Sequence, residues 1–122
     1  MTLPQAASDV LLLHNPRCSK SRATKALLEE RGIAFRERAY LAEPLSVAEL
    51  TELARRLGVP VSDMVRSGEA AYAEHGLGPA SEDEDVLKAM AQAPVLMQRP
   101  VVVRGDRARV GRPPEAVLEL FP

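Results

Sequence analysis

The sequence contains a single cysteine, Cys18, so no disulfide can form within its 122 residues. A metal site built from several cysteines is excluded for the same reason. Apolar runs are short, such as the four residues 10–13, whereas a membrane-spanning helix needs about 20. Residues 1–8 lack a basic start and an apolar stretch, so we expect no secretory signal. These absences favour a reducing compartment, and we expect the cytoplasm.

The chain also lacks an excess of either charge. Sixteen Lys and Arg residues face seventeen Asp and Glu residues, which gives a formal net charge of −1. Binding to the phosphate backbone of nucleic acids draws on clustered positive charge, so we expect no nucleic acid as a partner. The short apolar runs lead us to expect no membrane partner either. The hydrophobic fraction of 46% is enough for a core. We expect one domain at 9–122, preceded by a disordered lead-in at 1–8.

The first forty residues predict a strand, a tight loop, a helix and a second strand. Residues 9–14 contain a short apolar run and are followed by the turn residues Asn15-Pro16, which is typical of a buried strand. The pattern at 19–31 favours a helix that ends before Gly32. Alternation at 33–40 indicates the second strand. Right-handed βαβ crossovers place such strands parallel to each other.

A helical insertion is expected at about 45–93. Ser46 and Glu49 match a capping box, and Ser81 and Glu84 match a second one, each before an apolar stripe with helical spacing. Shorter helices are expected between them at 62–65, with Ser62 as the cap, and at 69–75. The acidic run that starts at Glu82 fits the positive end of a helix dipole, and we interpret it as capping rather than as a metal site.

The last part of the chain predicts a hairpin and a final helix. Strands are expected at 101–103 and 108–110, joined by the two-residue loop Gly105-Asp106. Prolines before 115–120 fit the first turn of a helix. The order β-α-β, helical insertion, β-β-α is the thioredoxin arrangement. We therefore expect an α/β, thioredoxin-like fold with a mixed four-stranded sheet.

Cys18 falls between the first predicted strand and the first predicted helix. The unpaired backbone N–H groups and the dipole of the helix start favour the thiolate there. Arg17, Lys20 and Arg22 add positive charge nearby. Cysteines in such surroundings can have pKa values of roughly 3.5–7.5, so Cys18 is a candidate nucleophile. The alternative, a buried small apolar residue, fits the polar and basic flanks less well.

Ser21 stands where a dithiol redox motif has its second cysteine. A lone thiol cannot resolve its own mixed disulfide, so an external thiol must complete the reduction. Glutathione and glutaredoxin are the obvious candidates. Two roles are open for the Ser21 hydroxyl: a hydrogen bond to the thiolate, or a hydrogen bond that satisfies the backbone at the helix start.

Several motifs occur in an order that is similar to a known family. The first comprises His14, Asn15, Pro16, Cys18, Ser21 and Arg22. Further along the chain come Tyr40-Leu41 with Pro44, Arg66, Arg99-Pro100 and Gly111-Arg112-Pro113. From residue 10 to residue 120, the chain resembles the glutaredoxin-dependent arsenate reductases.

This resemblance implies an enzyme that reduces arsenate to arsenite with Cys18 as the catalytic nucleophile. Three arginines, Arg66, Arg99 and Arg112, would surround the oxyanion. Arginine forks can bind two oxygens at once and remain charged, which suits this role. A cis Arg99-Pro100 bond is implied as well. No cofactor is expected to be tightly bound; glutathione would be a co-substrate and glutaredoxin a partner.

The residues that support the thiol allow more than one reading. His14 could tune the thiolate or hydrogen-bond within the loop, and Asn15 is expected to order that loop. Two other functions stay open: a general glutathione-linked thiol oxidoreductase, and a non-enzymatic regulator of the Spx type. Ser21 speaks against the regulator, because those proteins typically carry a second cysteine at this position.

Overall fold

The computed structural model describes residues 3–122 and divides into two compact units. The first, Met1–Tyr40 with Arg99–Pro122, contains the sheet and is named the sheet unit; the second, Leu41–Gln98, is named the helical unit. The expected helical insertion at about 45–93 lies inside the helical unit. Of the expected disordered lead-in at 1–8, residues 1 and 2 lie outside the described residues, and Leu3 is buried.

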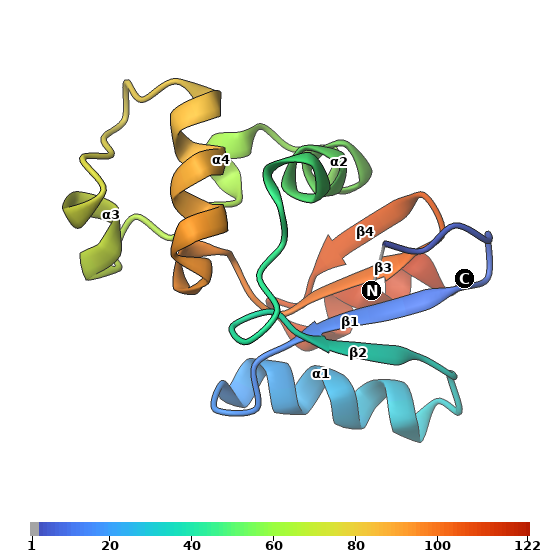
Figure 1. Ribbon diagram of the computed structural model, residues 1–122. Helices are drawn as coiled ribbons and strands as arrows, with labels where there is room; N and C mark the ends of the chain where they lie inside the picture. The colour runs from blue at the N-terminus through green and yellow to red at the C-terminus, as the bar shows by residue number, and fades with distance from the viewer. Residues whose placement is uncertain (1–2) are drawn as a thin grey trace. The chain divides into compact units, whose positions relative to one another are not determined.

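The sheet unit has four strands in the order β2-β1-β3-β4 (Figure 1). They are β1 Val10–His14, β2 Arg36–Ala39, β3 Val101–Arg104 and β4 Arg107–Val110. β1 is parallel to β2 and antiparallel to β3, and β3 is antiparallel to β4. This is the mixed sheet that the sequence predicts. β2 is shorter than the expected strand at 33–40, because only 36–39 pair with β1.

The hairpin between β3 and β4 confirms the predicted two-residue loop. Arg104 pairs with Arg107, which leaves Gly105 and Asp106 as the turn. Gly105 has a φ of +56°, a conformation open to glycine, whereas no other type of residue in the described chain has a positive φ. A positive φ at the first turn residue alone is the pattern of a type II′ turn.

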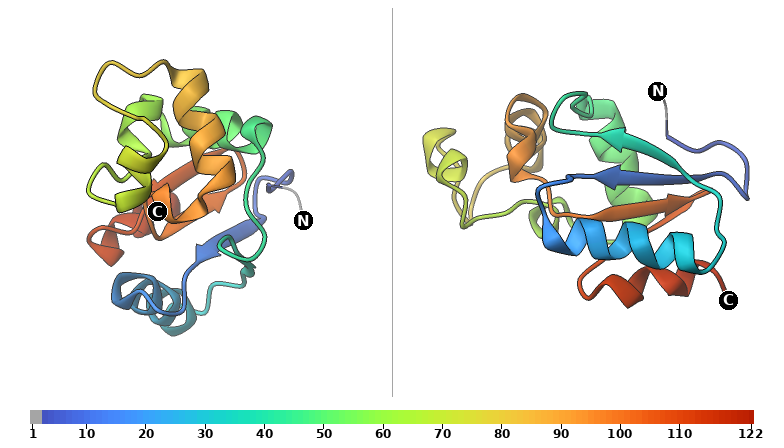
Figure 2. Two further views of the ribbon diagram at one scale, coloured as in Figure 1. Left: turned by 60° about the vertical axis from the view of Figure 1, so that its left-hand side comes forward. Right: turned by 90° about the horizontal axis from the view of Figure 1, so that it is seen from below.

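Two helical segments cover one face of the sheet. They are α1 Ser19–Glu30 and the final 3-10 helix η3 Pro114–Leu120, which lie side by side under the strands in Figure 2. Their side chains pack with those of β1 and β3 in one core cluster, which contains Val10, Leu12, Leu28, Val102, Val117 and Leu120. The predicted final helix at 115–120 is therefore present, with 3-10 rather than α geometry.

The helical unit consists of short helices. They are α2 Val47–Leu57, η1 Val61–Asp63, α3 Ala70–Glu74, α4 Asp83–Gln92 and η2 Pro94–Leu96. α2 and α4 pack against each other, and η1 and η2 both contact α4. α2 and α4 carry the two apolar stripes that the sequence predicts for this insertion. Their buried residues include Leu50, Leu53, Val86 and Met90.

One predicted capping box is confirmed and the other is wrong. Ser46 accepts a hydrogen bond from the backbone N–H of Glu49, and the Glu49 carboxylate accepts one from the backbone N–H of Ser46. α4 instead begins after Glu82, and the Ser81 hydroxyl accepts from the backbone N–H of Gly78. The Ser81 hydroxyl is thus bound to the preceding turn at Gly78 and does not cap α4. The expected cap at Ser62 is also wrong, since η1 begins after Pro60.

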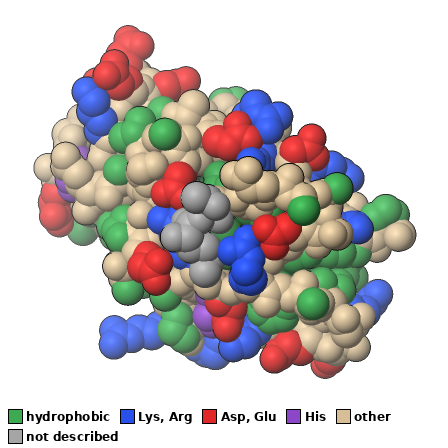
Figure 3. Space-filling view, turned by 45° about the vertical axis from the view of Figure 1, so that its right-hand side comes forward, with side chains coloured by type: hydrophobic (Ala, Val, Ile, Leu, Met, Phe, Trp, Pro, Cys, Tyr) green, Lys and Arg blue, Asp and Glu red, His purple; other side chains and the backbone are tan. Residues whose placement is uncertain are grey.

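The described surface carries both signs of charge. Acidic and basic side chains are interspersed on the face shown in Figure 3, in keeping with the nearly balanced composition. In residues 3–122, no helix combines the length and the apolar character that crossing a membrane requires.

Candidate active site

Cys18 is the N-cap residue of α1. Its extended backbone (φ −95°, ψ 123°) turns the chain from the loop after β1 into the helix. The Cys18 carbonyl accepts the first helical hydrogen bond, from Arg22 N at 3.0 Å, while Cys18 N donates to Asn15 O at 3.0 Å. The side chain is partly buried. Cys18 therefore lies at the start of a helix, as the sequence predicts.

The surroundings of the sulfur favour the thiolate. Burial is the largest single influence and raises the pKa of Cys18, but backbone hydrogen bonds from Ser21 and Lys20 and the Arg99 guanidinium together lower it below its ordinary value. The helix start and one arginine thus outweigh desolvation. Because the thiolate is the reactive form, this position suits a nucleophile.

Arg99 belongs to the sheet unit and lies just before β3. Its Nε and Nη1 atoms are buried and have no hydrogen-bond partner among the described residues. Buried arginine nitrogens without an acceptor are costly, so an oxyanion that accepts from them would be bound strongly. The Arg99-Pro100 bond is cis, as the resemblance implies.

Arg112 follows β4 and is exposed. The residue before it, Gly111, donates from its backbone N–H to Pro100 O at 2.9 Å. A Cβ on Gly111 would lie 2.6 Å from Thr24 Oγ1 and 2.8 Å from Pro100 Cγ, so only glycine permits this close approach. The segments of Arg99 and Arg112 are therefore joined beside α1, the helix that begins after Cys18.

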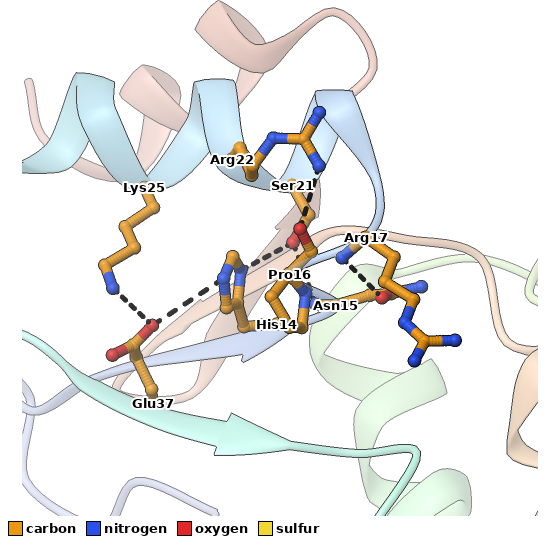
Figure 4. A network of polar contacts seen from close by, with 8 residues as sticks. All are labelled: His14, Asn15, Pro16, Arg17, Ser21, Arg22, Lys25 and Glu37. Carbon is orange, nitrogen blue, oxygen red and sulfur yellow. Dashed lines mark hydrogen bonds and ion pairs between the residues drawn. The ribbon is translucent and has the colours of Figure 1, made fainter.

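The Ser21 hydroxyl organises the loop rather than standing free beside the sulfur. It lies 2.7 Å from His14 Nδ1 and accepts a 3.0 Å hydrogen bond from Asn15 N (Figure 4). Ser21 is fully buried, and it lowers the pKa of Cys18 through a backbone hydrogen bond. Of the two roles left open by the sequence, the structure favours the one that satisfies the backbone.

The surroundings of His14 favour its neutral form. Burial lowers its pKa most; Glu37 opposes the shift, and Lys25 and Arg22 add to it. A neutral ring can accept the Ser21 hydroxyl proton at Nδ1. Glu37 Oε1 lies 3.9 Å from His14 Nε2 and 3.1 Å from Lys25 Nζ. The sequence analysis did not anticipate Glu37 or Lys25, because only the pairing of β2 with β1 brings Glu37 to His14.

The other polar residues of the loop bind its backbone. Asn15 Oδ1 accepts from Arg17 N at 3.0 Å, as expected of a residue that orders the loop. Arg22 Nη1 donates to Pro16 O at 2.8 Å. Arg22, one of the three cations expected near the thiol, thus binds the backbone of the loop. The guanidinium that lowers the pKa of Cys18 is that of Arg99.

Arg66 belongs to the helical unit. An isolated bridge between Val65 and Met97 anchors its segment, with Arg66 N donating to Leu96 O at 2.7 Å. Its Nη1 is paired with the carboxylate of Glu69. Glu69 is a third residue that was not expected from the sequence; its only signal is a spacing of three from Arg66.

Groups of three or more His, Cys, Asp or Glu that could hold a metal are absent from residues 3–122. The site brings together a thiol, backbone N–H groups and arginine. A thiol with a lowered pKa at a helix N-terminus, in this mixed four-stranded sheet, is the arrangement of a thiol-dependent protein with a thioredoxin-like fold.

Comparison with known proteins places the chain within that class. A model of the ArsC family matches residues 13–120, and the chain belongs to this family. An arsenate reductase of Haemophilus influenzae is 42% identical over 114 residues, which are 92% of this chain and 98% of that protein. The uncharacterized protein YfgD of Escherichia coli is 44% identical over 113 residues, with coverage of 91% and 95%. The solved structure of an arsenate reductase from Vibrio cholerae has a TM-score of 0.89 at 46% identity and covers 95% of this chain and 100% of that one.

Proposed function

We propose that this chain is an arsenate reductase and that Cys18 is its nucleophile. The observation that carries the proposal is a thiol whose pKa is lowered beside Arg99, an arginine with two buried nitrogens that lack an acceptor. A doubly charged tetrahedral oxyanion matches those donors. The relatives named arsenate reductase support arsenate as that oxyanion.

The reaction begins at the sulfur. The Cys18 thiolate attacks arsenic(V) and displaces one oxygen, which leaves as water after protonation. Arg99 and Arg112 bind the arsenate oxygens and stabilise the charge that develops on them. The family resemblance implies the same role for Arg66. The backbone N–H groups of Lys20 and Ser21 favour the anionic form of the sulfur before the attack. His14, Asn15, Ser21 and Arg22 keep the loop in the shape that presents these groups.

Glutathione completes the reduction. Its thiolate displaces a second oxygen, which also leaves as water after protonation, so that arsenic bears both sulfurs. The two sulfurs then join as a disulfide, both arsenic–sulfur bonds break, and one electron pair stays on arsenic, which takes up one water and leaves as arsenite. Cys18 remains as a mixed disulfide with glutathione. Because the chain has no second cysteine, the dithiol of glutaredoxin releases Cys18. This chemistry belongs in the cytoplasm, where glutathione is reduced.

The test is an assay that couples arsenate reduction to the oxidation of NADPH through glutathione, glutaredoxin and glutathione reductase. We expect arsenate-dependent consumption of NADPH with the unmodified protein and none with Cys18→Ser, because a serine hydroxyl is not ionised at neutral pH. Circular dichroism of Cys18→Ser controls for folding. Absence of arsenate-dependent NADPH oxidation by the unmodified protein would reject the proposal.

A second candidate is a general glutathione-linked thiol oxidoreductase. The lone thiol with a lowered pKa favours it, since that chemistry needs no oxyanion. Turnover of a glutathione mixed disulfide in the absence of arsenate reduction would select this candidate.

A further inference from the structure

Arg66 and Glu69 form an ion pair at the start of α3. Nη1 of Arg66 donates to Oε1 of Glu69, and the two side chains are 21% and 29% exposed. The pair is thus neither sealed in the interior nor free in solvent. Water competes less for such a pair than for one at the open surface.

Glu69 occupies the N-cap position of α3, yet its side chain makes no capping hydrogen bond. Carboxylates at this position commonly accept from the first N–H groups of a helix. The Glu69 carboxylate is turned to Arg66 instead. The pair is reinforced by the backbone, since Glu69 N donates to Arg66 O at 3.2 Å.

The backbone of Arg66 is fixed from its other side as well. Arg66 N donates to Leu96 O at 2.7 Å, and Gln98 N donates to Met64 O at 2.8 Å, on either side of the bridge between Val65 and Met97. The main chain of Arg66 is therefore fixed by backbone hydrogen bonds, and its guanidinium is fixed by Glu69. A guanidinium has five N–H donors, and the pair with Glu69 uses one nitrogen, which leaves Nε and Nη2 to bind an anion.

We propose that Glu69 is a positioning residue that holds the Arg66 guanidinium ready for the oxyanion. This inference rests on the proposed function, in which Arg66 binds arsenate. An unrestrained arginine loses side-chain entropy when it is fixed on a ligand, whereas a guanidinium already held at Nη1 loses less. The opposite possibility is that Glu69 competes with the oxyanion for Arg66; that predicts the opposite sign in the experiment below.

The experiment is a double-mutant cycle on kcat/KM for arsenate. We expect Glu69→Ala to lower it about tenfold, and Glu69→Gln, which keeps an acceptor for Nη1, to lower it by less. In an Arg66→Ala background, Glu69→Ala should have no further effect. Glu74→Ala is the matched control, because it removes an exposed carboxylate from the same helix, and we expect no change. A rise in kcat/KM with Glu69→Ala, or equal losses in both backgrounds, would overturn the inference.

Failure of the inference can be separated from failure of the proposed function. The same cycle is measured without turnover, as the protection of Cys18 from alkylation by arsenate or by inorganic phosphate. If the unmodified protein does not reduce arsenate, the proposed function fails, and the coupling between Glu69 and Arg66 in oxyanion binding still decides the inference. If it reduces arsenate and the effects of the two substitutions are additive, the inference alone fails.

Discussion

Two arginines, one in each unit, are predicted by resemblance for the same task, yet the structure holds them differently. Arg99 in the sheet unit has two buried nitrogens without an acceptor, and its charge acts on the Cys18 thiol. Arg66 in the helical unit has its own carboxylate, Glu69. Arg99 thus acts on the reactive sulfur, whereas Arg66 is paired with a neighbouring carboxylate and can bind an anion only through its remaining N–H donors.

The largest effect should come from Arg99. Arg99→Ala should lower kcat/KM for arsenate by about 10²–10³, since it removes a buried donor to the developing charge. Arg99→Lys should recover only part of the activity, because an ammonium cannot reproduce the two-donor fork. Both variants should also raise the pKa of Cys18, with Arg99→Ala raising it more, measured as the midpoint of the alkylation rate against pH.

Arg66→Ala sharpens the contrast. We expect it to weaken arsenate turnover while the alkylation midpoint of Cys18 shifts less than in Arg99→Ala, because the Arg99 guanidinium lowers the pKa of the thiol. An equal shift of that midpoint in Arg66→Ala and Arg99→Ala would show that the two arginines act on the thiol alike.

The elements that could be predicted from the sequence are those with local signals. Gly105-Asp106 defines its own turn, and Ser46 with Glu49 defines its own cap, because each signal needs only neighbours in the chain. Ser81 shows the limit, since its hydroxyl is taken by the preceding turn at Gly78 rather than by the helix.

The candidate site was predicted in part. The position of Cys18 at a helix start followed from the strand-loop-helix pattern. Arg99 is distant in sequence, so its role came from the family resemblance rather than from spacing. The partners Glu37 and Glu69 were missed, because one depends on strand pairing and the other is a charged residue among many on a polar surface.

A smaller effect concerns the pH dependence of stability. Burial lowers the pKa of His14 in the folded protein, so its contribution to stability is complete above the ordinary pKa of about 6.5 and is lost as pH falls through the folded value. His14→Gln cannot titrate, so the difference in the free energy of unfolding between pH 7.5 and pH 5 (about one unit above and about one and a half units below the ordinary pKa) should be smaller than in the unmodified protein. Urea unfolding measures this difference.

The matched control is His75→Gln, which removes the exposed histidine that ends α3 in the helical unit. We expect it to leave the pH dependence of unfolding unchanged. The same loss of pH dependence in both variants would show that burial of His14 in the sheet unit is not the cause of the pH dependence.

The smallest effect tests whether the helical unit influences the thiol at all. Ser46→Ala removes the hydroxyl of the capping box of α2 and should cost about 1 kcal/mol of stability, measured by urea unfolding. Ser81→Ala should cost less, because its hydroxyl caps a turn rather than a helix. Neither should move the alkylation midpoint of Cys18, since Ser21, Lys20 and Arg99, which lower the pKa of this thiol, belong to the sheet unit. A shifted midpoint in Ser46→Ala would mean that the ionisation of the Cys18 sulfur depends on the helical unit. The contrast between Arg99, which acts on the thiol, and Arg66, which is paired with Glu69, would then no longer correspond to the two units.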